Sequence, residues 1–582
     1  MEHESSLLQE LKRRRVFRAV LGYAVAAFAV LQIIEPVMHG LHWPDAVLSY
    51  VVVALAIGFP VVIALAWIFD VNAGRIERTA PGRLRGVRAR LLLGAAGMLA
   101  AAPVLAWYFV LRRPAEPSRL APVRADPGPS IAVLPLVNLS SDKEQEYFSD
   151  GLAEELLNLL AKVPGLRVAA RTSAFAFKGK NEDVTAIAQK LHVATILEGS
   201  VRKVGDQIRI TTQLVDAADG FHLWSETYDR KLTDVFAVQD EIAQAVVAAL
   251  KIKLLRPPTT KERRTVNPEA FTSYLLGNQL FHRNNVDGFR RAKQAYEQAV
   301  ALDPGYAAAW AGLAMATFWV ADAADTATSV AEGQDRALAA AEKAIELAPD
   351  LPDGYQARGF IRVPIRWDWE GARVDLQQAL ALKPDDPDAL SAYAYAVLRP
   401  LGRLSEAAGS LRKAAELDPL NARVWGMLGN VLALSGQFSA AREAFNRSLS
   451  ISPEQSFVAY NMGITFLLEG QPAAAKAINA RSSNEIFQLA GAALAEHDLR
   501  HPTESRKTLE DLIARYGHSG AYQIAQVYAW RGESDRALEW LHRARAQRDG
   551  GLTIVKVDPL FRSLHGDPRF GALLKSINLP SD

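Results

Sequence analysis

The chain has 582 residues, enough for three or four domains, and its 49% hydrophobic content excludes a mostly disordered protein. It contains no cysteine, which excludes disulfides, thiol catalysis and cysteine-ligated metal sites. The formal net charge is +2, yet residues 1–113 carry 13 Lys and Arg against 7 Asp and Glu, so the basic character belongs to the front of the chain. A membrane explains this better than nucleic acid does, and we expect no nucleic-acid partner.

Three apolar stretches near the amino terminus predict membrane-spanning helices. Segments 46–69 and 91–111 contain no charged residue, and each is long enough to cross a hydrocarbon core of about 30 Å at about 1.5 Å per residue. Segment 16–38 is weaker, because Arg18 and Glu35 flank its uncharged part. A cleaved signal peptide is the alternative for this segment, but the run is long and no A-x-A site follows it. Residues 16–111 are therefore predicted to be a membrane domain with three helices.

The basic residues predict an orientation for this domain. They cluster in residues 1–15 and in the loop 70–90, while the short loop between the first two spans has none. Because Lys and Arg favour the cytoplasmic side, we expect a cytoplasmic amino terminus and periplasmic carboxyl-terminal domains. The predicted location is the bacterial inner membrane, with several passes and with the lipid bilayer as a partner. Glu35 is either a functional acidic residue inside the membrane bundle or a residue that marks the outer interface of the membrane.

A proline-rich linker, 112–129, leads into a small α/β module at 130–253. The hairpin 196–204 and 207–215 flanks Gly205-Asp206, a favourable two-residue turn, and its second strand alternates apolar and polar residues. The other predicted elements are strands at 130–138, 166–170 and 222–229 and helices from Ser149 or Asp150, at 183–191 and at 235–252.

The module shows no recognisable catalytic motif. It has no G-x-G-x-x-G, Walker A or H-E-x-x-H sequence, and His192 and His222 are single histidines of the structural kind. Arg167 and the run 171–173 could bind an anion, although a solvated edge explains them as well. We expect no catalytic residue, no bound metal and no cofactor, and the chain is not predicted to be an enzyme.

Two runs of the module carry a family resemblance: SIAVLPLVNLSSDKEQEYFSDGLAEELLNLLAKVPGLRV and ILEGSVRKVGDQIRITTQLVDAADGFHLWSETYDR. Over about residues 130–250 they resemble the amino-terminal-domain-like module of TolB and the related flagellar FlgO proteins. The resemblance implies an α/β fold, an envelope setting and protein–protein contact. In similar chains the module lies between helical repeats and an effector, often a winged helix or a nucleotide cyclase. Only about 18 residues precede the first predicted span, so the resemblance implies neither DNA binding nor cyclase activity here.

After a linker at 254–267, the chain repeats itself. Pro349, Pro384, Pro419 and Pro453 end similar segments and are separated by 35, 35 and 34 residues, the tetratricopeptide period. Segment 421–453, NARVWGMLGNVLALSGQFSAAREAFNRSLSISP, fits the W-x2-L-G-x2-Y…A-x3-F…P pattern. Small residues at fixed positions let the two helices of a unit approach each other, and large residues fill the remaining space between them. Stacking of units is obligatory because one unit cannot bury its apolar face alone. We predict seven or eight units over 268–548 and a carboxyl-terminal cap with a polar helix at 549–582.

Two asparagines are the candidate partner-binding residues. Asn430 and Asn461 match the positions that peptide-clamping tetratricopeptide proteins use in the concave groove, and an amide both donates to and accepts from an extended peptide. Gly426 stands where a Lys of a full carboxylate clamp would be, so peptide contact is predicted without capture of a terminal carboxylate. The alternative is that both are ordinary surface asparagines. Trp367 and Trp369 are interpreted as packing between repeats.

The predicted fold class is multidomain: transmembrane helices, then a small α/β module, then an all-α tetratricopeptide solenoid. The predicted function is a non-catalytic, inner-membrane-anchored scaffold that presents a periplasmic solenoid to proteins or peptides. The alternative is a transmembrane signalling protein that relays partner binding through its membrane bundle and loop 70–90 to a cytoplasmic protein. The sequence indicates neither the partner nor the oligomeric state.

Overall fold

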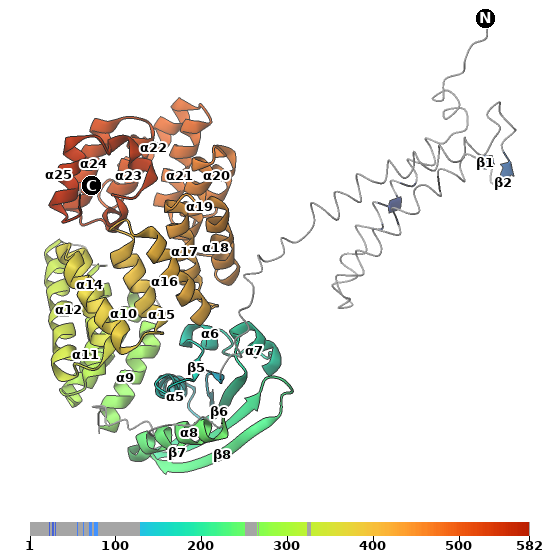
Figure 1. The fold of residues 1–582 in the computed structure, drawn as a ribbon, viewed down its shortest axis with the longest axis vertical. Coiled ribbons are helices and arrows are strands. Elements are labelled where there is room, and N and C mark those ends of the chain that lie inside the picture. Colours follow the sequence, from blue (N-terminus) through green and yellow to red (C-terminus); the bar gives the residue numbers. More distant parts are fainter. Residues whose placement is uncertain are drawn as a thin grey trace, which may run out of the picture. The chain divides into compact units, whose positions relative to one another are not determined.

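The computed structural model describes residues 129–250, 267–283, 285–322 and 327–580, together with Thr265 and scattered positions nearer the amino terminus. The chain divides into two compact units, Met1–Ala125 and Asp126–Asp582, and nearly all described residues belong to the second (Figure 1).

The described part of the first unit contains a pair of antiparallel strands. β1 (Phe69–Asn72) pairs with β2 (Arg75–Arg78), so that Phe69 lies opposite Arg78. The sequence predicted a helix ending at Phe69 and a loop over 70–90. Extended backbone therefore occupies the end of the predicted helix and the start of the predicted loop.

The predicted transmembrane helices are the part of the fold class that the structure contradicts. Crossing a bilayer takes about 20 consecutive apolar residues in one helix. Throughout the residues that the structure describes, no helix is both long enough and apolar enough for this. Most of the predicted spans at 16–38, 46–69 and 91–111 lies outside those residues. The described fold is mostly helical, with a small mixed sheet and a carboxyl-terminal region of helical repeats.

The predicted inner-membrane location is wrong for the same reason. The count of basic residues assigns sides only to loops between helices that cross the bilayer, and the described residues contain no such helix. The periplasmic placement and the lipid bilayer as a partner are likewise not supported. An uncharged run reports apolar composition, and it does not by itself specify a membrane-spanning helix.

The α/β module is built on a mixed sheet whose strands run in the order β5-β3-β6-β7-β8, with β4 also paired to β6. β3 is parallel to β5 and β6, whereas β6, β7 and β8 form antiparallel neighbours. Val204 pairs with Gln207 across the two-residue turn at Gly205, which has a positive φ of 62°. The strands are β3 (Ser130–Val133), β4 (Val137–Asn138), β5 (Arg167–Val168), β6 (Thr195–Val204), β7 (Gln207–Asp216) and β8 (His222–Lys231).

Helices cover the two faces of this sheet unequally. α5 (Glu146–Leu160) and α8 (Val235–Ala249) bury its inner face, which includes Ile210 and Leu214 of β7. α6 (Arg171–Phe175) and α7 (Val184–Leu191) belong to the other side, where α7 packs on Ala132 and Ile196 near the start of β6. Figure 1 shows α8 beside β7 and β8, with α6 and α7 at the opposite end of the module. The outward side chains along the rest of β6, β7 and β8 are half-buried or exposed.

The described residues of 268–546 form eight antiparallel helix pairs, each packed on the next. The pairs are α9 (Pro268–Phe281) with α10 (Val286–Leu302), α11 (Ala307–Asp322) with α12 (Ala327–Leu347), α13 (Pro352–Arg366) with α14 (Trp369–Leu382), α15 (Pro387–Tyr393) and the π-helix η4 (Ala394–Leu398) with α16 (Leu404–Leu417), α17 (Ala422–Leu434) with α18 (Phe438–Ile451), α19 (Ser456–Leu468) with α20 (Pro472–Asn479), α21 (Glu485–Asp498) with α22 (Pro502–Tyr516), and α23 (Ala521–Trp530) with α24 (Ser534–Ala546).

The fifth pair shows why its residue types recur. A Cβ on Gly429 of α17 would lie 2.4 Å from the Phe445 ring of α18, so the glycine makes room for the ring. Trp425 Nε1 donates to the carbonyl of Pro419, 2.9 Å away, and ties the start of α17 to the proline that ends the preceding unit. The second pair repeats this bond, from Trp310 to Pro304. The Trp and the Pro of the repeat motif are thus joined by a hydrogen bond from the indole N–H to the proline carbonyl.

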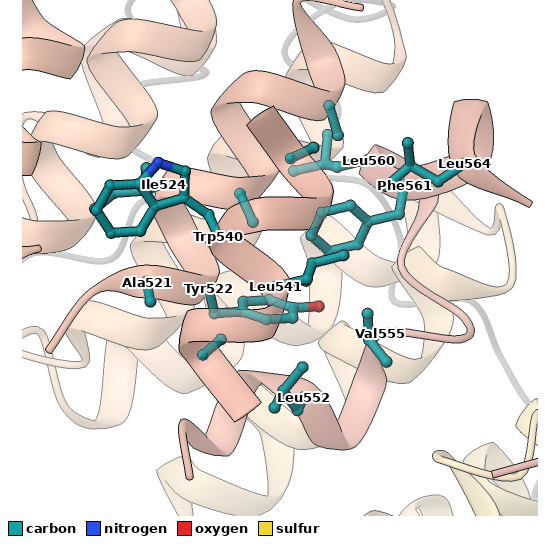
Figure 2. Close-up of a cluster of buried hydrophobic side chains, with 14 of the residues drawn as sticks. Ala521, Tyr522, Ile524, Trp540, Leu541, Leu552, Val555, Leu560, Phe561 and Leu564 are labelled. Carbon is teal, nitrogen blue, oxygen red and sulfur yellow. The ribbon is translucent and has the colours of Figure 1, made fainter. Parts of the chain in front are cut away.

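The carboxyl-terminal cap consists of the 3-10 helices η5 (Gly550–Ile554) and η6 (Pro559–Leu564) and of α25 (Pro568–Ser576). Its apolar side chains enter the core of the last repeat, where Phe561 meets the Tyr522 ring edge-on at 5.4 Å (Figure 2). The cap also reaches the third pair, because Trp369 Nε1 donates to the Ile577 carbonyl at 2.8 Å. The predicted polar helix is therefore amphipathic, with Phe570 and Leu574 buried.

Replacing Phe445 by alanine tests the ring-on-glycine contact. The ring is fully buried, so Phe445→Ala should lower the free energy of unfolding of the solenoid by about 3–5 kcal/mol. Urea unfolding and hydrogen exchange over 422–451 measure the loss. Val374→Ala, at an exposed position of α14, should change stability by less than about 0.5 kcal/mol. Equal shifts in the two variants would contradict this account of the repeat.

Candidate partner-binding site

The structure brings the two predicted asparagines together. Asn430 lies in α17 and Asn461 in α19, and Asn430 Nδ2 donates to Asn461 Oδ1 at 2.8 Å. Asn461 Nδ2 in turn donates to the Phe457 carbonyl at 2.8 Å. The two residues are 1% and 8% exposed, so their amides meet each other and the chain rather than solvent. Their role in partner binding stays a prediction.

Arg399 completes this row of polar side chains. Its Nη1 donates to Asn430 Oδ1 at 3.2 Å, and its guanidinium carbon lies 3.3 Å from the centroid of the Tyr395 ring. Arg399 directly follows the π-helix η4, and its backbone N–H donates to the carbonyl of Ala394 five residues earlier. Such π segments often occur at functional sites, where the wider turn redirects a side chain.

Arg399 is a buried cation with neutral partners. It is 4% exposed, its Nη2 donates to Thr553 Oγ1 at 3.1 Å, and it forms no salt bridge with any residue that the structure describes. Its Nε has no hydrogen-bond partner in that part of the chain. Burial lowers the pKa of the guanidinium, because the charged form loses its hydration.

Sequence analysis missed Arg399 because it sought a basic residue at Gly426, in the same repeat as Asn430. The cation comes from the preceding repeat. A signal was available, since Arg399 precedes Asn430 by 31 residues and Asn430 precedes Asn461 by the same 31.

The opposite wall of the site belongs to the last repeat and the cap. Asp558 is buried and accepts hydrogen bonds from Tyr522 Oη and Gln526 Nε2, both at 2.7 Å, and Tyr460 Oη donates to Gln526 Oε1 at 2.8 Å. Burial raises the pKa of Asp558, and these hydrogen bonds oppose the rise. Asp558 thus takes its donors from Tyr522 and Gln526 on the same wall, whereas Arg399 bonds to Asn430 on the opposite wall.

Between the walls lies a cavity of about 20 Å³, bordered by Asn430, Asn461, Gln526 and Asp558. This volume holds about one water molecule. Ile554 of η5 and Pro559 of η6 also border the cavity, so the cap closes the site. An extended peptide reaches the asparagines only if residues 550–559 move.

A larger hollow, of about 530 Å³, lies where the third pair meets the end of the cap. Its lining comprises Trp367, Asp368, Trp369, Glu370, Leu401 and Asn578. The carboxylates there are engaged: Asp368 caps α14 through the Gly371 N–H, and Glu370 pairs with Arg373. Asn578 Nδ2 donates to the Trp367 carbonyl. The two tryptophans, interpreted from sequence as packing between repeats, thus also contact the cap.

The module joins the solenoid through buried polar bonds. Ser173 donates to Asp418 Oδ1 from its backbone N–H at 3.0 Å and from Oγ at 2.5 Å, and Leu420 N–H donates back to Ser173 Oγ at 2.8 Å. The sequence marked 171–173 as a possible anion site, and the anion bound there is Asp418 of the same chain. At a second contact, Glu154 Oε2 accepts from Arg171 Nε at 2.7 Å and Oε1 accepts from Asn278 of α9 at 3.4 Å.

The side chains at these sites are hydrogen-bond donors and acceptors. His192, one of the two single histidines, is the left-handed residue that ends α7. Among the described residues no group of three or more His, Cys, Asp or Glu side chains is arranged to hold a metal ion. The arrangement can bind amides, carbonyls and an anion.

Comparison with known proteins identifies the repeats. The tetratricopeptide repeat family model matches residues 400–456. A protein of Rhizobium meliloti (strain 1021) named "Putative adenylate cyclase 3" is 38% identical over 265 residues, 44% of this chain and 44% of its own length. Human tetratricopeptide repeat protein 13 is 34% identical over 101 residues, 17% of this chain and 12% of its own. The chain thus spans less than half the length of these curated relatives.

Solved structures are more distant. A Pseudomonas aeruginosa pilF structure covers 37% of this chain and 93% of its own, with 19% identity and a TM-score of 0.30. A structure of PilW, described as a widely conserved type IV pilus biogenesis factor, covers 37% and 98%, with 20% identity and a TM-score of 0.32. These scores are too low to carry an argument. The family match confirms the prediction of tetratricopeptide repeats over residues 400–456, and the structure continues the same kind of helix pairs over the described residues of 268–546.

Removing either partner of the Ser173–Asp418 bond should loosen the junction between module and solenoid. Ser173→Ala leaves a buried carboxylate short of a donor and should cost about 1–3 kcal/mol, measured by urea unfolding and by hydrogen exchange at residues 171–175 and 418–421. Asp418→Ala combined with Ser173→Ala should cost less than the sum of the single changes, because both remove the same bond. Strict additivity would show that the two side chains act independently.

The same carboxylate predicts a dependence on pH. Burial raises the pKa of Asp418, and hydrogen bonds from Ser173 and Asn421 oppose the rise. The folded state therefore holds the proton more tightly than the unfolded chain does, so this contribution is full below the unfolded pKa and is lost as the pH rises through the folded one. The stability advantage of the wild type over Asp418→Ala should shrink as the pH rises from about 4, the ordinary pKa of an aspartate, toward neutral. An advantage that grows over this interval would contradict the assignment.

Proposed function

We propose that the chain is a non-catalytic scaffold whose tetratricopeptide solenoid binds an extended peptide or protein segment along the row Arg399, Asn430 and Asn461. The observation that carries this proposal is that the row already holds a polypeptide segment, the chain's own η5, through the bond from Arg399 to Thr553. The same groups can hold a partner's backbone and side chains in its place.

The buried charge indicates what kind of segment binds. Arg399 meets only an amide, a hydroxyl and an aromatic ring in the described structure, and a carboxylate would satisfy the guanidinium better than the Thr553 hydroxyl does. The partner segment is therefore acidic. Asn430 and Asn461 hold its backbone.

Displacing η5 has a cost that the partner must offset. Leu552 and Val555 are fully buried, and exposing each costs about 1.5–3 kcal/mol. One charge-assisted hydrogen bond contributes about 1.5–3 kcal/mol, which does not cover both losses. The partner segment therefore combines an acidic residue with apolar side chains that replace Leu552 and Val555.

The α/β module supports the scaffold role in this proposal. Residues 130–250 resemble TolB-like modules that make protein contacts, and the module is tied to the solenoid through Ser173 and Asp418. The proposed boundaries are those of the sequence analysis: a module at 130–253, repeats at 268–548 and a cap at 549–582. The relative named for adenylate cyclase matches over 44% of its length, and we assign the shared part to interaction rather than to cyclase chemistry.

The test is a panel of extended peptides that carry an acidic residue between apolar residues, titrated against the full chain by fluorescence anisotropy. Asn430→Ala and Asn461→Ala should each weaken binding about tenfold, which corresponds to about 1.4 kcal/mol. The matched control is Asn446→Ala, an exposed asparagine on α18 of the same repeat, which should leave binding unchanged. Binding that is insensitive to all three changes, or absent across the panel, would overturn the proposal.

A further inference from the structure

The described residues cover the outer face of the module's sheet incompletely. α7 packs against Ala132 of β3 and the start of β6, and beyond it the outward side chains of β4, β6, β7 and β8 are half-buried or exposed. We call this surface the open sheet face. It belongs to the module and has no part in the site at Asn430 and Asn461.

Large apolar side chains gather on this face. Because side chains alternate along a strand, the register that buries Val201 and Leu214 on the inner face places their neighbours on the outer one. Three of the exposed large apolar residues of the described chain lie there by this alternation: Val137, Leu139 and Val204. Val204 is 61% exposed and Val137 58%. Exposed apolar groups concentrated on one face mark an interaction surface.

The charges on the face are incompletely paired. Arg209 forms two hydrogen bonds with Asp229, at 2.6 and 3.0 Å, across β7 and β8. Arg202 lies directly opposite Arg209 in the register, a like-charge pair, and forms no ion pair among the described residues. Among the described residues, Glu198 accepts from Gln213 alone, a neutral partner, at 2.6 Å. One cation and one anion therefore stay unmatched on strand β6, four residues apart.

From these observations we infer that the open sheet face binds a second copy of this chain. Glu198 and Arg202 flank Ser200 symmetrically on the same face of β6. We place a two-fold axis in the plane of the face, perpendicular to the strands and over Ser200. This rotation sets Glu198 of each copy opposite Arg202 of the other copy, so two ion pairs form. The same rotation sets Val137, which pairs with Ser200, against its own counterpart.

The area of the face agrees with a weak dimer. Three strands of ten residues, each about 33 Å long and about 4.8 Å apart, with β4 beside them, offer at most about 500 Å² per copy, because α7 covers the start of β6. The total of at most about 1,000 Å² lies at the low end of specific interfaces, where association is weak and transient. We therefore expect a monomer–dimer equilibrium and not an obligate dimer.

Charge exchange on β6 tests this arrangement in the full chain. Sedimentation velocity over a concentration series should show a monomer–dimer equilibrium. Glu198→Arg and Arg202→Glu should each weaken it at least tenfold, because each sets like charges opposite one another, whereas the combined exchange should restore it. Val137→Lys should also weaken it, while Val374→Lys, at an exposed apolar position of α14, should not.

The absence of cysteine from the chain allows a direct test of the geometry. A short bis-maleimide should link two copies of the Ser200→Cys variant and should leave Val374→Cys unlinked. Far-ultraviolet circular dichroism confirms that each variant is folded. A monomer at all concentrations, failure of the combined exchange to restore the dimer, or linkage through residue 374 in place of 200 would each overturn the inference. None of these outcomes bears on peptide binding at Asn430.

Discussion

A helical repeat cannot bury its own apolar face, and this constraint governs the whole of the described structure. In the fifth pair the Phe445 ring fills the space that Gly429 leaves open, and Tyr296 fills the space at Gly277 in the first pair in the same way. Stacking buries the apolar face of every inner repeat between two neighbours, but the first and last repeats each keep one uncovered apolar face. The ends of this solenoid are covered by different means.

The α/β module covers the first end. Phe271 and Leu275 of α9 belong to the same buried cluster as α5 and the inner face of the sheet, and Leu275 contacts α5 so closely that a Cβ on Gly151 would lie 2.6 Å from it. The cap covers the last end, where Phe561 packs on Tyr522. The module is thus part of the solenoid's core as well as a domain, and the bond from Ser173 to Asp418 joins it at a second place, the end of α16 in the fourth pair.

Closing the last end has a consequence for the candidate site. The cap that buries Leu552 and Val555 in the final repeat also carries Thr553 to Arg399 and Asp558 to Gln526. The groups suited to a peptide are therefore occupied by the chain itself, and a cavity of about one water remains between them. Stability of the last repeat and access to the asparagines are in competition, so any partner segment has to replace the apolar contacts of η5 as well as its hydrogen bonds.

The sequence by itself determined what depends on local spacing. The proline period identified the repeats, the alternation of β7 and the Gly205 turn located the hairpin, and the same period placed Asn430 and Asn461 on consecutive first helices. Tertiary structure alone decided what depends on contacts between distant segments. Asp418 meets Ser173 across 245 positions and Arg399 meets Thr553 across 154, and no periodicity encodes either pair. The predicted transmembrane helices were wrong because apolar composition alone does not specify a membrane-spanning helix, and throughout the described residues no helix is long and apolar enough to cross a bilayer.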